Sequence, residues 1–124
     1  MPKMISKALC ISPLLLISSL SFADCDRNMN QTDLNICTAQ EYKQADQKLN
    51  KLYKSYTAKL TSAQRKQFID IQKTWVNYKN KDCRYTAQAY EGGSMYPLVL
   101  NDCLTEKTED RIEDLEDYLQ DTKR

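Results

Sequence analysis

The stretch Leu60-Thr61-Ser62-Ala63-Gln64 divides a long helical segment into two helices and decides the fold of this chain. Thr61 and Gln64 match a capping box, in which a Ser or Thr and a Gln or Glu three residues later each bond the other's backbone N–H at a helix start. Because only a few residues then separate the two helices, we expect them to run antiparallel as a long hairpin.

Before the capping box, the sequence has the periodicity of one long amphipathic helix. We expect this helix to begin near residues 30–32 and to continue to about residue 60, since neither Gly nor Pro interrupts it. Its apolar positions recur in steps of three to five residues and so share one face. These positions are Leu34, Cys37, Tyr42, Ala45, Leu49, Leu52, Tyr56 and Leu60.

Two further helices are predicted after the capping box. The second places Phe68, Ile71, Trp75 and Tyr78 on one apolar face and is expected to end near residues 83–85. Pro97 suits the first turn of the third helix, which we expect to end close to residue 124. The predicted fold class is therefore all-α, a long antiparallel helical hairpin with a third helix packed on it.

The first 23 residues have the three parts of a cleavable signal peptide. Lys3 and Lys7 give a basic start, residues 8–20 are mostly apolar, and Ser21-Phe22-Ala23 is a small-x-small cleavage site. The apolar run is shorter than the roughly 20 residues that span a bilayer. We therefore expect residues 1–23 to be removed and residues 24–124 to form one helical domain without a membrane span, either periplasmic or secreted, in a bacterium.

Four cysteines remain after Cys10 leaves with the signal peptide: Cys25, Cys37, Cys83 and Cys103. An even number in a small exported chain favours disulfides, each stabilising the fold by roughly 2–4 kcal/mol. Zinc is disfavoured, because the chain has no His and no Cys-x-x-Cys pair. The expected positions of the four cysteines along the bundle axis favour the pairs Cys25–Cys83 and Cys37–Cys103. The pairs Cys37–Cys83 and Cys25–Cys103 fit nearly as well.

The sequence offers little catalytic apparatus. It lacks His, the commonest general base, and contains no Gly-x-Ser-x-Gly elbow, phosphate-binding loop or dinucleotide fingerprint. Acidic residues crowd the predicted third helix, but such a run is more typical of a solvated helix face than of a catalytic or calcium site. We therefore expect no enzymatic activity, no metal site and no cofactor.

Charge is unevenly distributed along the chain. Residues 41–84 contain eleven basic and four acidic residues, a net charge of +7, whereas residues 102–121 have a net charge of −7. One explanation is that the two regions neutralise each other within the fold. The other is that the acidic helix attracts a cationic protein partner by long-range steering. Residues 24–124 together carry a net charge of −1, which gives no support for nucleic-acid binding.

Both glycines of the chain lie in one loop, which we expect to be a partner-binding loop or an aromatic cap of the bundle. The pair allows backbone angles closed to other residues, and Tyr is enriched at protein interfaces. The loop consists of Tyr90, Glu91, Gly92, Gly93, Ser94, Met95 and Tyr96.

A second group of residues is predicted to form a structural polar network that joins the three helices. The network follows from the rule that buried polar groups need hydrogen-bond partners, and it predicts an ion pair between Arg111 and Asp46. Its members are Asp46, Asn50, Gln72, Trp75 and Arg111.

The order and spacing of short motifs along the chain resemble those of the LprI-like lysozyme inhibitor family of bacterial envelope proteins. The motifs are Cys37, Ala45-Asp46, Leu49-Asn50, Tyr53, Gln72, Trp75, Tyr78-Lys79, Cys83, Gly92-Gly93-Ser94, Cys103-Leu104, Thr108, Arg111 and Leu115. The resemblance covers nearly all of residues 24–124. One departure is Lys79-Asn80 where the family usually has Arg-Asp, which weakens the case for a buried ion pair there.

The resemblance implies a secreted or periplasmic protein that inhibits lysozyme-type peptidoglycan hydrolases. The acidic charge of the predicted third helix favours a cationic lysozyme as its protein partner. The alternative is a non-enzymatic binding, structural or immunity module of the envelope that has a bacterial protein partner. If the protein is an inhibitor, residues 90–96 are the candidate plug for an enzyme cleft that carries two carboxylates, with Ser94 as the hydroxyl donor.

Overall fold

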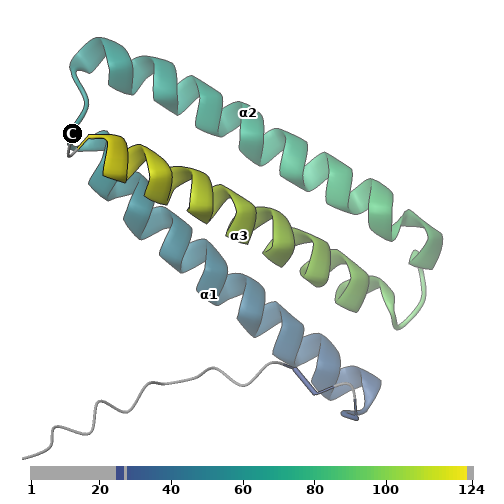
Figure 1. Ribbon diagram of the computed structural model, residues 1–124. Helices are drawn as coiled ribbons and strands as arrows, with labels where there is room; N and C mark the ends of the chain where they lie inside the picture. Colours follow the sequence, from purple (N-terminus) through teal and green to yellow (C-terminus); the bar gives the residue numbers. More distant parts are fainter. Residues whose placement is uncertain (1–24, 27, 123–124) are drawn as a thin grey trace, which may run out of the picture.

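The structure, a computed structural model, describes residues 25–26 and 28–122 and is all-α over this part (Figure 1). Helix α1 spans Gln31–Thr57, α2 spans Ser62–Ala87 and α3 spans Tyr96–Asp121, with a short 3-10 turn, η1, at Gln88–Tyr90. None of these helices is long and apolar enough to cross a membrane. The predicted fold class is confirmed, whereas the predicted signal peptide lies outside the described residues.

The turn between α1 and α2 is built by side chains, as the capping box predicts. Thr61 Oγ1 accepts a hydrogen bond from the N–H of Gln64 at 3.2 Å, and Gln64 Oε1 accepts one from the N–H of Thr61 at 3.0 Å. Arg65 then reaches back, and its Nε donates to the carbonyl of Thr57 at 3.0 Å. Polar groups that the helix ends would leave unpaired are thereby satisfied on both sides of the turn.

Replacing Thr61 with alanine is expected to lower the free energy of unfolding by about 1 kcal/mol, since it removes one half of the capping box. For a domain of this size the melting temperature should fall by about 4–8 °C. Thr74→Ala is a matched control, because Thr74 is exposed within α2 and its hydroxyl donates to the carbonyl of Asp70 in its own helix. Equal losses in the two variants, measured by thermal unfolding, would show that the capping box contributes nothing specific.

Helix α3 lies between α1 and α2, parallel to α1 and antiparallel to α2 (Figure 1). The most extensive helix–helix contact is between α1 and α3, with a smaller contact between α2 and α3. The two arms of the hairpin therefore pack mainly on α3.

The hydrophobic core near the α1–α2 turn is rich in aromatic rings. Leu49, Phe68, Ile112 and Leu115 are buried there, one from α1, one from α2 and two from α3. The ring of Phe68 meets that of Tyr56 edge-on, with the centroids 4.8 Å apart. All three helices thus contribute to one core.

The prediction that Ile71 and Tyr78 face the core is wrong, because the side chains of both residues are exposed. Helix α2 turns Phe68, Lys79 and Cys83 inward instead. Ile71 and Tyr78 lie three residues after Phe68 and Trp75, which places them at the edge of the inward stripe. The angular position of a residue around the helix axis decides its burial here. Residues at the margin of an apolar stripe can therefore be either buried or exposed.

The disulfides are Cys25–Cys37 and Cys83–Cys103, so both pairings favoured from the sequence are wrong. Heights along the bundle correctly place all four cysteines toward one end, but they do not determine which pairs face each other. The segment before α1 folds back along that helix, which brings Cys25 to Cys37 with a Cα–Cα distance of 5.8 Å. The short α2–α3 connection brings Cys83 to Cys103, with a Cα–Cα distance of 5.5 Å.

Candidate functional site

Three of the five residues of the predicted polar network meet in the interior of the bundle. Arg111 is 6% exposed, its Nε donates to Oε1 of Gln72 at 3.0 Å, and its guanidinium lies 5.9 Å from the ring of Trp75. Within the described residues the ion pair of Arg111 is with Asp114, at 3.2 Å, and the predicted pair with Asp46 is not formed.

Asp46 and Asn50 form a separate contact on α1. The amide of Asn50 donates to the carboxylate of Asp46 at 3.3 Å, and Asn50 is exposed. The ion pair between Asp46 and Arg111 was predicted from the rule that buried polar groups need partners. Here Arg111 instead uses an acid one turn away on its own helix, together with aromatic rings.

Lys79 is a second buried cation and was not among the predicted members of the network. It is 4% exposed, and its Nζ donates to the hydroxyl of Tyr42 at 2.8 Å. The same Nζ lies 5.2 Å from the ring of Tyr42 and 5.0 Å from that of Trp75. Its position four residues after Trp75, on the apolar stripe of α2, is the signal that could have identified it.

Lys79 and Arg111 both lie near the Trp75 ring, and their bonds to Tyr42 and Gln72 connect the three helices through neutral acceptors. Cation–π contacts of this kind stabilise by about 0.5–2 kcal/mol each, the larger values applying where the groups are desolvated. Nη2 of Arg111 is buried and has no hydrogen-bond partner among the described residues. Both cations are enclosed, so this cluster acts as a structural element of the core.

The predicted loop, residues 90–96, is an exposed turn fixed at both sides. The N–H of Gly93 donates to the carbonyl of Tyr90 at 3.0 Å, and the amide of Asn35 on α1 donates to the carbonyl of Ser94 at 2.9 Å. Gly92 has φ = +80°, a conformation that favours glycine. Apart from Tyr96, which is half-buried, every residue of the loop is exposed.

The outward side of α3 forms an acidic face, which we define as Glu106, Glu109, Asp110, Glu113 and Asp117. All five side chains are exposed, and none forms an ion pair with another described residue. Neutralisation within the fold is therefore incomplete. An uncompensated row of carboxylates produces a negative potential that extends into solvent.

Among the residues that the structure describes, two ion pairs connect α3 with the hairpin. Lys48 of α1 lies 3.2 Å from Glu116, with both side chains largely exposed. Lys107 of α3 lies 2.8 Å from Asp82 of α2, and this hydrogen bond raises the pKa of the lysine above its usual value. These pairs attach the edges of α3 to its neighbours and leave its outward side free.

A groove of about 750 Å³ runs along the border between α1 and α3. Ala45 and Ile112 provide apolar surface within it, and most of its other residues are polar or acidic. It is lined by Glu41, Gln44, Ala45, Lys48, Thr105, Glu109, Ile112, Glu113 and Glu116. The acidic face of α3 therefore continues into a concave surface shared with α1.

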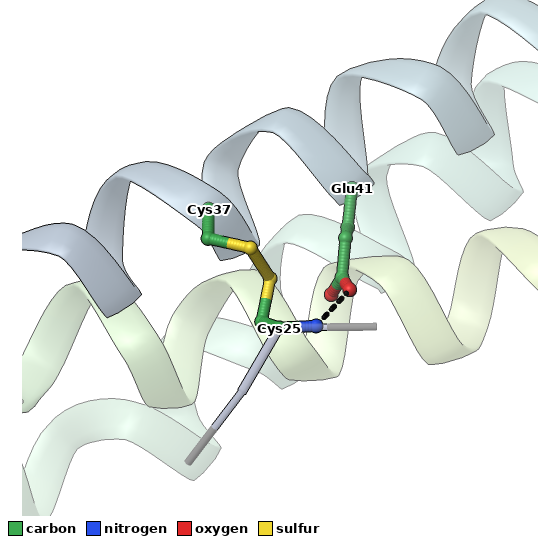
Figure 2. A group of neighbouring side chains, drawn as sticks. All are labelled: Cys25, Cys37 and Glu41. Atoms are coloured by element: carbon green, nitrogen blue, oxygen red, sulfur yellow. Dashed lines mark hydrogen bonds between the residues drawn. A yellow bond between two sulfur atoms is a disulfide. The ribbon is translucent and has the colours of Figure 1, made fainter. Parts of the chain in front are cut away.

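Cys25, Cys37 and Glu41 lie together at the start of α1 (Figure 2). Their sulfur and carboxylate atoms are within 4.8 Å of one another, a spacing suitable for a metal ion. The two sulfurs are bonded to each other, however, so neither is a thiolate that could ligate a metal. Glu41 Oε1 instead accepts a hydrogen bond from the N–H of Cys25 at 3.0 Å, which fastens the segment before α1 to the helix.

Comparison with known proteins assigns this chain to a family. The family model described as lysozyme inhibitor LprI matches residues 24–115, which include both disulfides, the loop and most of α3. The chain belongs to the LprI family. The resemblance found from the motifs is thereby confirmed.

Among curated proteins, this LprI-family chain is similar to a protein of Rhizobium meliloti (strain 1021) named only as uncharacterized. The two are 32% identical, over 78% of this chain and 79% of the relative. No solved structure matches the chain significantly. The family name therefore provides the link to lysozyme.

Proposed function

We propose that this protein is an exported, non-enzymatic inhibitor of lysozyme-type peptidoglycan hydrolases. The observation that carries the proposal is the match of residues 24–115 to the lysozyme inhibitor family. Two disulfides in a small domain are typical of proteins from oxidising compartments outside the cytoplasm. The signal-like residues 1–23 support the same compartment, the periplasm or the exterior of a bacterial cell.

The acidic face of α3 is the surface that we propose attracts the enzyme. Its five exposed carboxylates have no ion-pair partner among the described residues, so their field acts on approaching molecules. A cationic hydrolase would be steered toward this side of the bundle, and its association rate would depend strongly on ionic strength.

The loop at residues 90–96 is our candidate for direct contact with the active-site cleft. Glycosidase clefts carry two carboxylates, and a hydroxyl such as that of Ser94 can donate a hydrogen bond to one of them. The loop is exposed, yet the Asn35–Ser94 hydrogen bond and the internal turn bond restrain it. A restrained loop loses less conformational entropy on binding than a free one.

The direct test is turnover of peptidoglycan by lysozymes of more than one type, with residues 24–124 added in molar excess. Inhibition of at least one type is expected. If the excess leaves the rate of every type unchanged, the proposal is wrong, and a non-enzymatic envelope module with a bacterial partner becomes the better explanation.

Charge variants then test the contact surfaces. For Glu109→Gln with Glu113→Gln we expect the association rate with an inhibited lysozyme to fall about tenfold at low salt, and less at high salt. The control pair Asp46→Asn with Asp70→Asn changes the net charge equally but away from α3. Ser94→Ala should instead weaken inhibition at every salt concentration. Equal effects of both charge pairs would contradict a specific role of α3.

A further inference from the structure

One face of the bundle is formed by α1 and α2 without α3, and its exposed charges are mostly basic. We define the basic face as Lys43 and Lys54 of α1 with Lys66, Lys73 and Arg84 of α2. All five side chains are exposed. A shallow hollow of about 210 Å³ marks this face, and it is lined by Tyr53 of α1 and by Ile69, Gln72, Lys73 and Val76 of α2.

Helical spacing aligns the basic residues along the hollow. Lys66, Lys73 and Arg84 lie at positions i, i+7 and i+18, which correspond to nearly the same direction around α2. They run beside Ile69 and Val76, the residues that line the hollow. On α1, Lys54 directly follows Tyr53, and Lys43 lies eleven residues, close to three turns, before it.

The basic face is poorly neutralised within the fold. None of its five cations forms an ion pair with a described carboxylate. The two acids on or beside it are Asp46, which accepts a hydrogen bond from Asn50, and Asp70. The face therefore has an excess of three positive charges, whereas the carboxylates of the acidic face project from another side of the bundle.

The hollow adds apolar surface between the two rows of cations. Val76 is 39% exposed, and Tyr53 and Ile69 are half-buried beside it. Surfaces that lie on membranes combine apolar groups with Lys and Arg, because the former enter the interface while the latter meet anionic headgroups. A soluble anionic polymer would contact the cations but would have no use for the apolar surface between them. The combination therefore favours a bilayer.

We infer that the basic face docks this protein on an anionic phospholipid bilayer, with the acidic face of α3 left in solvent. This inference goes beyond the proposed inhibition and does not depend on it. Docking would hold the molecule at the envelope surface in one orientation. Each basic residue near such a bilayer strengthens binding by about fivefold, so several together give measurable association without any membrane-spanning segment.

The test is flotation of residues 24–124 with lipid vesicles, because this fragment contains the whole described bundle and both disulfides but lacks the apolar residues 8–20. Vesicles of phosphatidylcholine with 30% phosphatidylglycerol, a composition chosen as roughly that of a moderately anionic leaflet, are compared with pure phosphatidylcholine. Binding to the anionic vesicles is expected at low salt, with a large loss at about 0.5 M salt. Binding to neutral vesicles should be at least tenfold weaker.

Matched variants localise the surface. Lys66→Gln with Lys73→Gln removes two charges from the basic face and should weaken vesicle binding about 25-fold. Lys51→Gln with Lys59→Gln removes two exposed charges that lie outside the basic face, one on α1 and one in the α1–α2 turn, and should weaken it less than about threefold. Equal losses in the two pairs, no binding to anionic vesicles, or retention by peptidoglycan alone would overturn the inference. Lysozyme inhibition measured without vesicles should be the same in both pairs, so the two proposals can fail separately.

Discussion

Arg111→Ala is expected to lower the free energy of unfolding by about 3 kcal/mol, which corresponds to a fall in melting temperature of roughly 12–24 °C. The guanidinium lies 5.6 Å from the ring of Phe68 and 5.9 Å from the rings of Trp75 and Tyr118. Truncation would leave a cavity among these rings and remove the hydrogen bond to Gln72. Urea unfolding of the purified domain measures the change.

Two control variants separate packing from charge at this position. Arg111→Met keeps an unbranched, polarizable side chain against the rings and removes the buried Nη2 that has no partner. Since well-packed apolar replacements of buried ions are often nearly neutral, its expected cost is about 1 kcal/mol or less. Arg84→Ala, at an exposed site of α2, should change stability by about 0.5 kcal/mol or less.

The outcome decides what the buried cation contributes. A loss with methionine as large as that with alanine would show that the charge itself is required, through its contacts with rings and with Asp114. A loss below about 1 kcal/mol with alanine would show that the rings close over the gap, and the account of Arg111 as a central element of the core would then be wrong.

The helices were predictable because their signals are local in sequence. The capping box at Thr61 and Gln64 and the proline at residue 97 lie within one turn of the helix starts that they mark. The apolar stripes similarly require only knowledge of neighbouring residues. Fold class followed from these signals, since three long helices with short connections have few ways to pack.

Contacts between helices were predicted less well, because they depend on how each helix is rotated about its axis. Rotation decides that Cys83 faces Cys103 and that Arg111 points at Gln72 and away from Asp46. Lys79 was missed for a related reason. A lysine within an apolar stripe breaks the binary pattern, and only the positions of the Tyr42 and Trp75 rings show how its charge is accommodated.

For the candidate loop and the acidic helix, the sequence indicates local conformation and charge, whereas the binding role of either stays a prediction. Residues 90–96 form the exposed, glycine-dependent turn that their composition indicates. The grouping of exposed carboxylates on one side of α3 also follows from helical spacing. The inhibitory contact that we propose for these surfaces depends on the shape of the partner enzyme, which this chain does not encode.

Loss of the Cys83–Cys103 disulfide is expected to be the other severe perturbation. Replacing both residues with alanine should cost about 4 kcal/mol. About 3 kcal/mol of this comes from the freed loop, whose ends are 20 residues apart in sequence, and the rest from the cavity left by Cys83, which is 0% exposed. Small domains are stable by only about 5–15 kcal/mol, so a large part of the stability would be lost.

The Cys25–Cys37 pair is the matched control, and its removal should cost only about 2 kcal/mol. The chain-entropy relation gives a similar stabilisation for its 12-residue separation, about 3 kcal/mol, but that relation assumes a native state that stays fixed without the bond. Without the disulfide, the hydrogen bond from Cys25 to Glu41 would still connect the segment before α1 to the helix. We expect this bond to be too weak to prevent fraying, so the segment would regain conformational entropy in the native state as well as in the unfolded state. Urea unfolding of both double variants, with hydrogen exchange at residues 25–30, measures the two effects. Equal losses of stability would mean that this segment stays docked without its disulfide, and that Glu41 contributes more than one partly buried hydrogen bond normally does.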